Sequence, residues 1–335
     1  MSSLRRILVG LLLLGSLAAW TSAAFADDAA HTTTPKHVAV HPVISSFASF
    51  DQNGMRFHYP EDYASLVVPL ARQSTQTAAR IVADLSPHVL DSVDIYFVYE
   101  MEDYFRAAGE KPRNPHWASG LALLGEDVIL VKLSPNRGAR LELDRTLAHE
   151  LSHIALDHHV KGRALPHWFV EGFALLQTEE WNLGRANALA EAAVSDSLLP
   201  LWELDESFPA GAAKAQLAYA ESGHFLRWLI SWRGRVRFQQ LTANLGQGMP
   251  FRPAFEKAYT ESFDDIEHKW RTDLQVEDGW VAIIVASSTL FFAIGVLFVG
   301  IYLRVRHQRE VAFAQIVPEP GPPVPEHLRD FGPFA

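Results

Sequence analysis

The chain has 335 residues, 48% of them hydrophobic, with a formal net charge of −10 and no cysteine. A disulfide scaffold is therefore excluded, so the chain must bury a core large enough to be stable without cross-links. The acidic balance and the lack of a basic stripe argue against a nucleic-acid-binding protein, whose surface needs clustered Lys and Arg.

The N-terminus has the pattern of a secretory signal. Arg5 and Arg6 form a charged start, an apolar run follows, and Ala-Phe-Ala at 24–26 fits an A-x-A cleavage site. We expect a signal peptide at 1–26 and a flexible spacer at 27–44; the alternative is an uncleaved anchor helix. In both cases the chain that follows is exported.

The next part of the chain, up to residue 133, mixes strand and helix patterns. We expect strands at 54–59 and 92–99, helices at 63–85 and 101–108, and a hairpin at 118–133 that turns at 125–127.

The pattern from residue 145 to 274 is helical throughout. The expected helices are 145–156, 166–180, 188–195, 213–231, 235–244, 251–258 and 263–274. Strands in the first half and helices in the second predict an α+β fold rather than a doubly wound sheet.

Residues 280–303 are apolar and carry no charge. Their length suffices to cross a hydrocarbon core of about 30 Å. The basic residues Arg304, Arg306 and Arg309 follow directly. By the positive-inside rule we expect one transmembrane helix at 280–303, with a Pro-rich cytoplasmic tail at 304–335.

An HExxH motif, His149-Glu150-Leu151-Ser152-His153, lies within the expected helix 145–156. Residues four apart share one face of a helix, so both imidazoles can reach one metal ion. Glu150 is rotated by about 100° from His149. Its carboxylate can thus act as general base on a zinc-activated water.

Catalytic zinc needs a third protein ligand. Glu171 is the preferred candidate, because a carboxylate among the large apolar residues of His-Trp-Phe-Val-Glu-Gly-Phe is costly to bury without a strong partner. The alternatives are His159, six residues after His153, and His167, four residues before Glu171.

HELSH followed by LPHWFVEGFA resembles the gluzincin metallopeptidases, in particular the peptidase MA-like domain, which we place at 45–276. The resemblance implies a thermolysin-like fold with a mixed sheet and helices in the first half and a helical second half. It implies one Zn²⁺ ion, peptide-bond hydrolysis, and binding of extended peptide along an edge strand near Gly120–Leu123. It also implies an oxyanion donor on a later helix, either Tyr219 or His224.

These features predict a zinc metallopeptidase on the outer face of the cytoplasmic membrane, single-pass, with a periplasmic catalytic domain and a peptide or protein substrate in the cell envelope. Two alternatives remain open. One is a catalytically idle module of the same fold that binds peptides. The other is a zinc hydrolase that acts on peptidoglycan cross-links.

Overall fold

The computed structural model describes residues 47–112, 118–133, 140–178 and 182–314, without the side chains of residues 183, 276–293 and 309–314. The expected signal peptide and spacer lie outside the described residues, as does the expected tail beyond residue 314. The chain divides into two compact units, Met1–Gly279 and Trp280–Ala335. The first unit holds the whole sheet.

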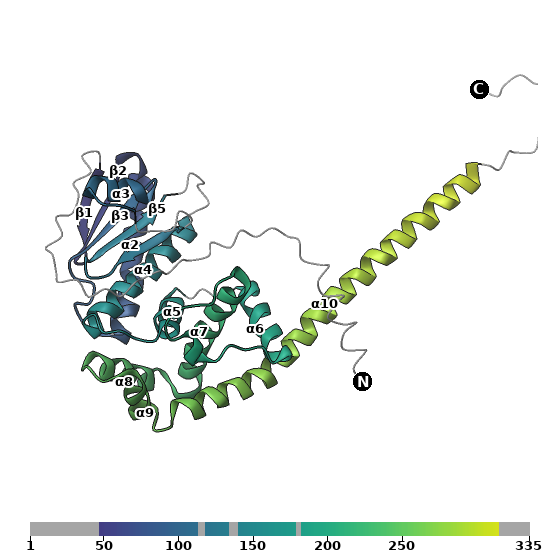
Figure 1. Ribbon diagram of the computed structural model, residues 1–335. Helices are drawn as coiled ribbons and strands as arrows, with labels where there is room; N and C mark the ends of the chain where they lie inside the picture. Colours follow the sequence, from purple (N-terminus) through teal and green to yellow (C-terminus); the bar gives the residue numbers. More distant parts are fainter. Residues whose placement is uncertain (1–46, 113–117, 134–139, 179–181, 315–335) are drawn as a thin grey trace, which may run out of the picture. The chain divides into compact units, whose positions relative to one another are not determined.

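Within the described residues, five strands form one mixed sheet in the order β1-β2-β3-β5-β4 (Figure 1). They are β1 (Phe47–Gln52), β2 (Met55–Pro60), β3 (Val93–Val98), β4 (Gly120–Leu123) and β5 (Val128–Lys132). β2, β3 and β5 run parallel to one another. The outer strands run antiparallel to their neighbours, β1 to β2 and β4 to β5. The mixed sheet confirms the predicted α+β class, and β4 and β5 are the predicted hairpin.

Helices pack on both faces of this sheet because side chains alternate in direction along β3. Ile95 and Phe97 join the main core with α2 (Ala64–Asp84) and α4 (Arg140–Val160). Tyr96 and Val98 join a smaller core with α3 (Met101–Ala108). All four side chains are at most 2% exposed. Burial of each contributes about 1.5–3 kcal/mol, so the hydrophobic faces hold these three helices on the sheet.

The described part of the first unit after α4 is mainly helical, as predicted for the second half of the domain. Its helices are α5 (His167–Gln177), α6 (Leu183–Ser195), α7 (Ala212–Arg233), α8 (Arg235–Gly246), α9 (Phe251–Tyr259) and the start of α10 (Phe263–Ala314). The indole of Trp168 joins α5 to α7 and α9, with ring centroids 5.4 Å from Phe225 and 5.5 Å from Phe251.

The start of α6 differs from the prediction, which placed it at residue 188. The helix begins at Leu183 because Asn182 caps it: the side-chain oxygen of Asn182 accepts a hydrogen bond from the backbone N–H of Arg185 at 2.9 Å. Asparagine is among the best N-cap residues, and the cap compensates for the weak apolar pattern of the first turn.

The backbone of α10 is helical without a break from Phe263 to Ala314, where the prediction had two separate helices. Residues 275–279 contain no proline, and the single Gly279 costs about 1 kcal/mol in a helix, which is too little to end one.

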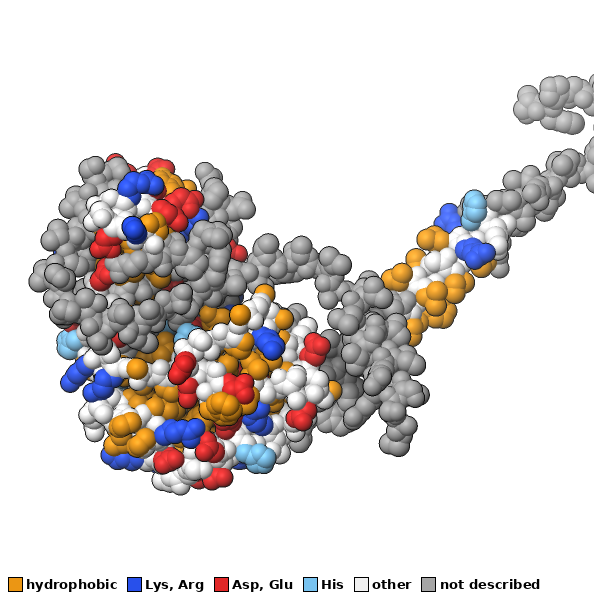
Figure 2. All heavy atoms as spheres, in the orientation of Figure 1, with side chains coloured by type: hydrophobic (Ala, Val, Ile, Leu, Met, Phe, Trp, Pro, Cys, Tyr) orange, Lys and Arg blue, Asp and Glu red, His pale blue; other side chains and the backbone are white. Residues whose placement is uncertain are grey.

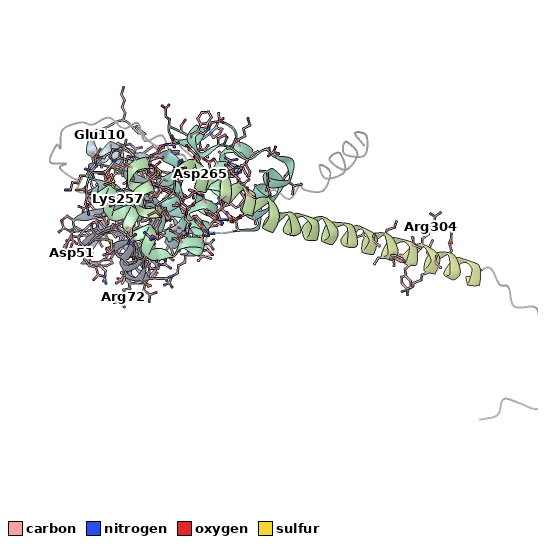
Figure 3. All side chains as sticks on the ribbon, turned by 90° about the horizontal axis from the view of Figure 1, so that it is seen from below. Asp51, Arg72, Glu110, Lys257, Asp265 and Arg304 are labelled. Atoms are coloured by element: carbon pink, nitrogen blue, oxygen red, sulfur yellow. The ribbon has the colours of Figure 1, made fainter. Side chains whose placement is uncertain are left out.

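Among the residues that the structure describes, no helix has the length and the low polarity that crossing a membrane requires. The described apolar side chains of α10 between Ile294 and Val305 are 40–69% exposed, and Figure 2 shows them along the helix. Figure 3 shows the side chain of Arg304 projecting from the same helix.

Two features join the sheet to the helical half. Helix α4 contacts β4 and β5 as well as α5 and α8. The carboxylate of Asp84, which is 1% exposed, accepts hydrogen bonds from Arg235 Nε at 2.7 Å and from Gln177 Nε2 at 2.7 Å. A buried carboxylate is stable only with such partners, so Asp84 ties the end of α2 to α5 and α8.

Candidate metal centre

Helix α4 presents the two histidines of the HExxH motif side by side. His149 is 2% exposed, and the imidazoles of His149 and His153 lie with ring centroids 4.6 Å apart and planes at 82°. Four residues make slightly more than one helical turn, which places both rings on the face of α4 that packs against α5.

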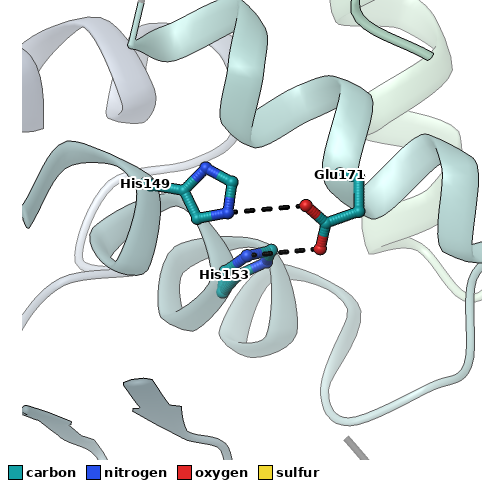
Figure 4. Close-up of side chains that lie close together, drawn as sticks. All are labelled: His149, His153 and Glu171. Atoms are coloured by element: carbon teal, nitrogen blue, oxygen red, sulfur yellow. Dashed lines mark ion pairs between the residues drawn. The ribbon is translucent and has the colours of Figure 1, made fainter. Parts of the chain in front are cut away.

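Glu171 reaches this pair from α5 (Figure 4). Its Oε2 lies 3.4 Å from His149 Nε2, and its Oε1 lies 3.5 Å from His153 Nε2. The Glu171 side chain is fully buried. One nitrogen from each histidine and one carboxylate oxygen lie within 4.8 Å of one another.

These distances suit a metal ion. Two ligand atoms bound at 2.0–2.1 Å to a tetrahedral zinc ion are about 3.4 Å apart. Two imidazoles and one carboxylate are also a ligand set that catalytic zinc uses, with the fourth position left for water or substrate. The donors present therefore fit one zinc ion.

The segment after α6 holds α5 in this position. The backbone N–H of His167 donates to the carbonyl oxygen of Asp205 at 2.8 Å, and the indole N–H of Trp168 donates to Asp205 Oδ1 at 3.0 Å. Asp205 thus fixes the first turn of the helix that carries Glu171. No local pattern in the sequence links Asp205 to α5, so this contact could not be predicted from the sequence.

The two alternative third ligands lie elsewhere. The Nε2–H of His159 donates a hydrogen bond to the carbonyl oxygen of Thr242 at 2.7 Å, and its Nδ1 hydrogen-bonds with Ser86 Oγ at 3.0 Å. It faces away from His153 because α4 continues past Leu156, so six residues rotate its side chain by about 240°. The ring of His167 packs against Phe208 at 4.5 Å.

Glu150, the predicted general base, is 4% exposed and lies against the edge strand β4. A Cβ atom added to Gly120 would overlap Oε1 of Glu150 and lie 2.9 Å from its Cγ. The carboxylate of Glu150 is therefore next to the backbone of β4, on the side of α4 that meets the sheet.

Tyr219 lies on α7, the helix that packs most extensively against α5. A Cβ added to Gly172, the residue after Glu171, would lie 2.7 Å from the backbone oxygen of Ser222. The Tyr219 ring is 7% exposed and packs edge-on against Phe208 at 4.7 Å. Phe208 thus contacts both Tyr219 and His167, a contact that the sequence did not indicate.

His224, the alternative oxyanion donor, takes part in packing between α7 and α10. Its Nδ1 accepts a hydrogen bond from the indole N–H of Trp270 at 2.9 Å. Burial, with a smaller contribution from Arg227, lowers the pKa of His224 to about 4. The ring is therefore neutral at pH 7, with its proton on Nε2 rather than on Nδ1.

A further buried acid lies two residues after Tyr219. Glu221 is fully buried, and its Oε1 accepts the backbone N–H of Leu199 at 2.8 Å. Burial raises the pKa of Glu221 to about 8, while the Leu199 hydrogen bond lowers it. Its role is to hold the segment between α6 and α7, a role without a sequence signature.

The structure also has an open pocket of about 1060 Å³ near the C-terminal end of α4. Its lining includes Asp127, His158 and Gln247, and none of its lining residues belongs to the group of His149, His153 and Glu171. The pocket is therefore separate from the candidate metal centre.

A comparison with curated proteins found no match. The family model described as the Peptidase MA superfamily matches residues 73–276, more than half of the chain. The matched segment contains α4 and α5, and with them all three candidate metal ligands. The chain therefore belongs to the Peptidase MA superfamily.

Proposed function

We propose that the chain is a zinc-dependent metallopeptidase of the gluzincin type. The observation that carries the proposal is the meeting of His149, His153 and Glu171 from two helices, with separations that suit one zinc ion. Membership of the Peptidase MA superfamily supports the same reaction class.

Bound zinc would activate a water molecule and polarise the scissile carbonyl. Glu150 follows His149 directly in the chain, and its side chain lies against β4. Its carboxylate would take a proton from the attacking water and deliver it to the leaving amine. Tyr219, on the helix packed against α5, is our choice for the hydroxyl that donates to the oxyanion.

The outer edge of β4 supports an extended peptide as substrate. Among the residues that the structure describes, β4 pairs only with β5 and ends the sheet. A peptide that adds to this edge would form backbone hydrogen bonds beside Glu150. Such binding suits an extended peptide segment rather than a compact folded domain. The cell envelope as the place of this substrate rests on the proposed export of the domain.

We also propose that residues 280–303 anchor the chain in the cytoplasmic membrane, with the domain at 45–276 outside and the C-terminus inside. Two features of the sequence support this proposal. Residues 280–303 carry no charge, and Arg304, Arg306 and Arg309 follow them, which favours a cytoplasmic C-terminus.

The decisive experiment replaces Glu150. Glu150→Gln keeps the shape of the side chain but cannot accept a proton, so the variant should retain zinc and lose nearly all hydrolysis of casein. Glu142→Gln, an exposed glutamate on the same helix, is the matched control and should keep wild-type activity. Tyr219→Phe in this assay should lower kcat about 10²-fold with little change in KM.

Hydrolysis by Glu150→Gln at the wild-type rate would exclude the proposed base. A wild-type protein that binds zinc and peptide but cleaves neither casein nor isolated peptidoglycan would indicate the idle binding module. Cleavage of peptidoglycan cross-links alone would indicate the envelope hydrolase.

A further inference from the structure

Gly120 is the first residue of the edge strand β4 and is buried. Its backbone does not require glycine, since its φ lies outside the left-handed region. A Cβ at this position would nevertheless overlap Oε1 of Glu150, lie 2.5 Å from Cγ2 of Thr146 and lie 2.9 Å from Cγ of Glu150. The glycine is therefore needed for space and not for conformation.

The neighbours of Gly120 cannot easily move away. Thr146 is 5% exposed and β-branched, so its χ1 angle is restricted on α4. Thr146 and Glu150 are four residues apart and share the face of α4 that meets β4. Of the two, only the Glu150 side chain has a flexible end that can give way.

We propose that Gly120 is a positioning residue, whose missing side chain lets β4 approach α4 closely enough to hold the Glu150 carboxylate in one place. The inference rests on the proposed function, in which that carboxylate is the general base. A methyl group at 120 would push the carboxylate aside, and a misplacement of about 1 Å can cost about 10²-fold in rate.

The effect should spare the metal ligands. The three atoms nearest to a Cβ at 120 all belong to Thr146 and Glu150. Gly120→Ala should therefore lower kcat about 10²-fold and change KM less than about threefold. Its zinc content, measured by mass spectrometry, should equal that of the wild type. Gly184→Ala, the same change on α6, is the matched control and should leave kcat within about twofold.

A double-mutant cycle tests whether Gly120 acts through Glu150. Glu150→Asp withdraws the carboxylate from Gly120 and should retain a measurable rate. In that background Gly120→Ala should lower kcat less than about threefold, because the side chain that it displaces is already shortened. A loss of about 10²-fold in both backgrounds would mean that Gly120 acts by another route, and would overturn the inference.

Thermal unfolding gives a second readout that does not depend on hydrolysis. Both backgrounds carry Thr146→Ser, which removes Cγ2, the other atom that a Cβ at 120 would meet. With that change, Gly120→Ala should lower Tm at least twice as much when Glu150 is present as in Glu150→Ala, where the overlap with the Glu150 side chain is removed. If Gly120→Ala fails to fold, Glu150→Ala should restore folding. Equal losses of Tm in both backgrounds, or misfolding in both, would overturn the inference.

The two readouts separate the inference from the proposed function. Suppose that the Tm loss from Gly120→Ala depends on the Glu150 side chain while the wild type hydrolyses no peptide. The peptidase proposal then fails, and the placement of the Glu150 side chain by Gly120 stands. If the wild type is active and the effects of Gly120→Ala on kcat and Tm do not depend on residue 150, the peptidase proposal stands and the proposed role of Gly120 is wrong.

Discussion

Glu171 and His159 are both buried, yet only Glu171 faces the two histidines of the motif. Glu171→Gln should therefore weaken zinc binding at least about 10-fold, because a neutral amide is a poorer ligand than a carboxylate. His159→Ala should keep zinc and lose about 1–3 kcal/mol of stability, since the Thr242 carbonyl oxygen loses its partner. Zinc titration measures the zinc affinity of both variants, and urea unfolding measures their stability. Loss of zinc in His159→Ala, with zinc retained in Glu171→Gln, would make His159 the third ligand.

At the scale of elements, one contact joins the C-terminal end of α4 to the hairpin that carries β4. His158 Nε2 lies 2.6 Å from Asp127 Oδ1, and His158 Nδ1 lies 2.8 Å from the carbonyl oxygen of Val89. The Asp127 hydrogen bond raises the pKa of His158 above its usual value of about 6.5, against the lowering effect of burial. The contact therefore fastens the turn of the hairpin to the helix that carries the HExxH motif.

The sign of the pKa shift predicts how the stability of this contact changes with pH. A raised folded-state pKa means that the stabilisation is complete below about pH 6.5 and is lost as pH rises through the raised value. The difference in unfolding free energy between wild type and His158→Gln should therefore shrink from pH 5.5 to pH 8.5. Urea unfolding measures it, with His268→Gln, an exposed histidine on α10, as control. A difference that stays constant with pH would contradict the conclusion that folded His158 is charged and paired with Asp127.

At the scale of the whole molecule, the prediction concerns topology. If 1–26 directs export and 280–303 spans the membrane, the domain at 45–276 lies outside and a tag placed after Ala335 lies inside. Protease added to spheroplasts should digest the domain and leave the tag intact. A protected HExxH region with a digested tag would reverse the orientation, and release of the whole chain into the soluble fraction would exclude the anchor.

The sequence by itself determined what depends on local periodicity. The helical repeat places His149 and His153 on one face whatever surrounds them. The strand and helix patterns predicted the hairpin, the α+β class and most helices, because side chains alternate in strands and recur every three to four residues in helices. The motifs also predicted the Peptidase MA superfamily, which the family model confirms.

Tertiary structure alone decided the contacts between distant segments. Glu171 lies beside His149 and His153 because of how α5 packs on α4, which no spacing in the chain encodes. The close approach of Gly120 to Glu150 depends on the sheet edge meeting α4. The hydrogen bond from Trp270 to His224 joins residues 46 apart in the chain. Such contacts arise from packing of whole elements, whose energy is spread over many side chains and leaves no local pattern.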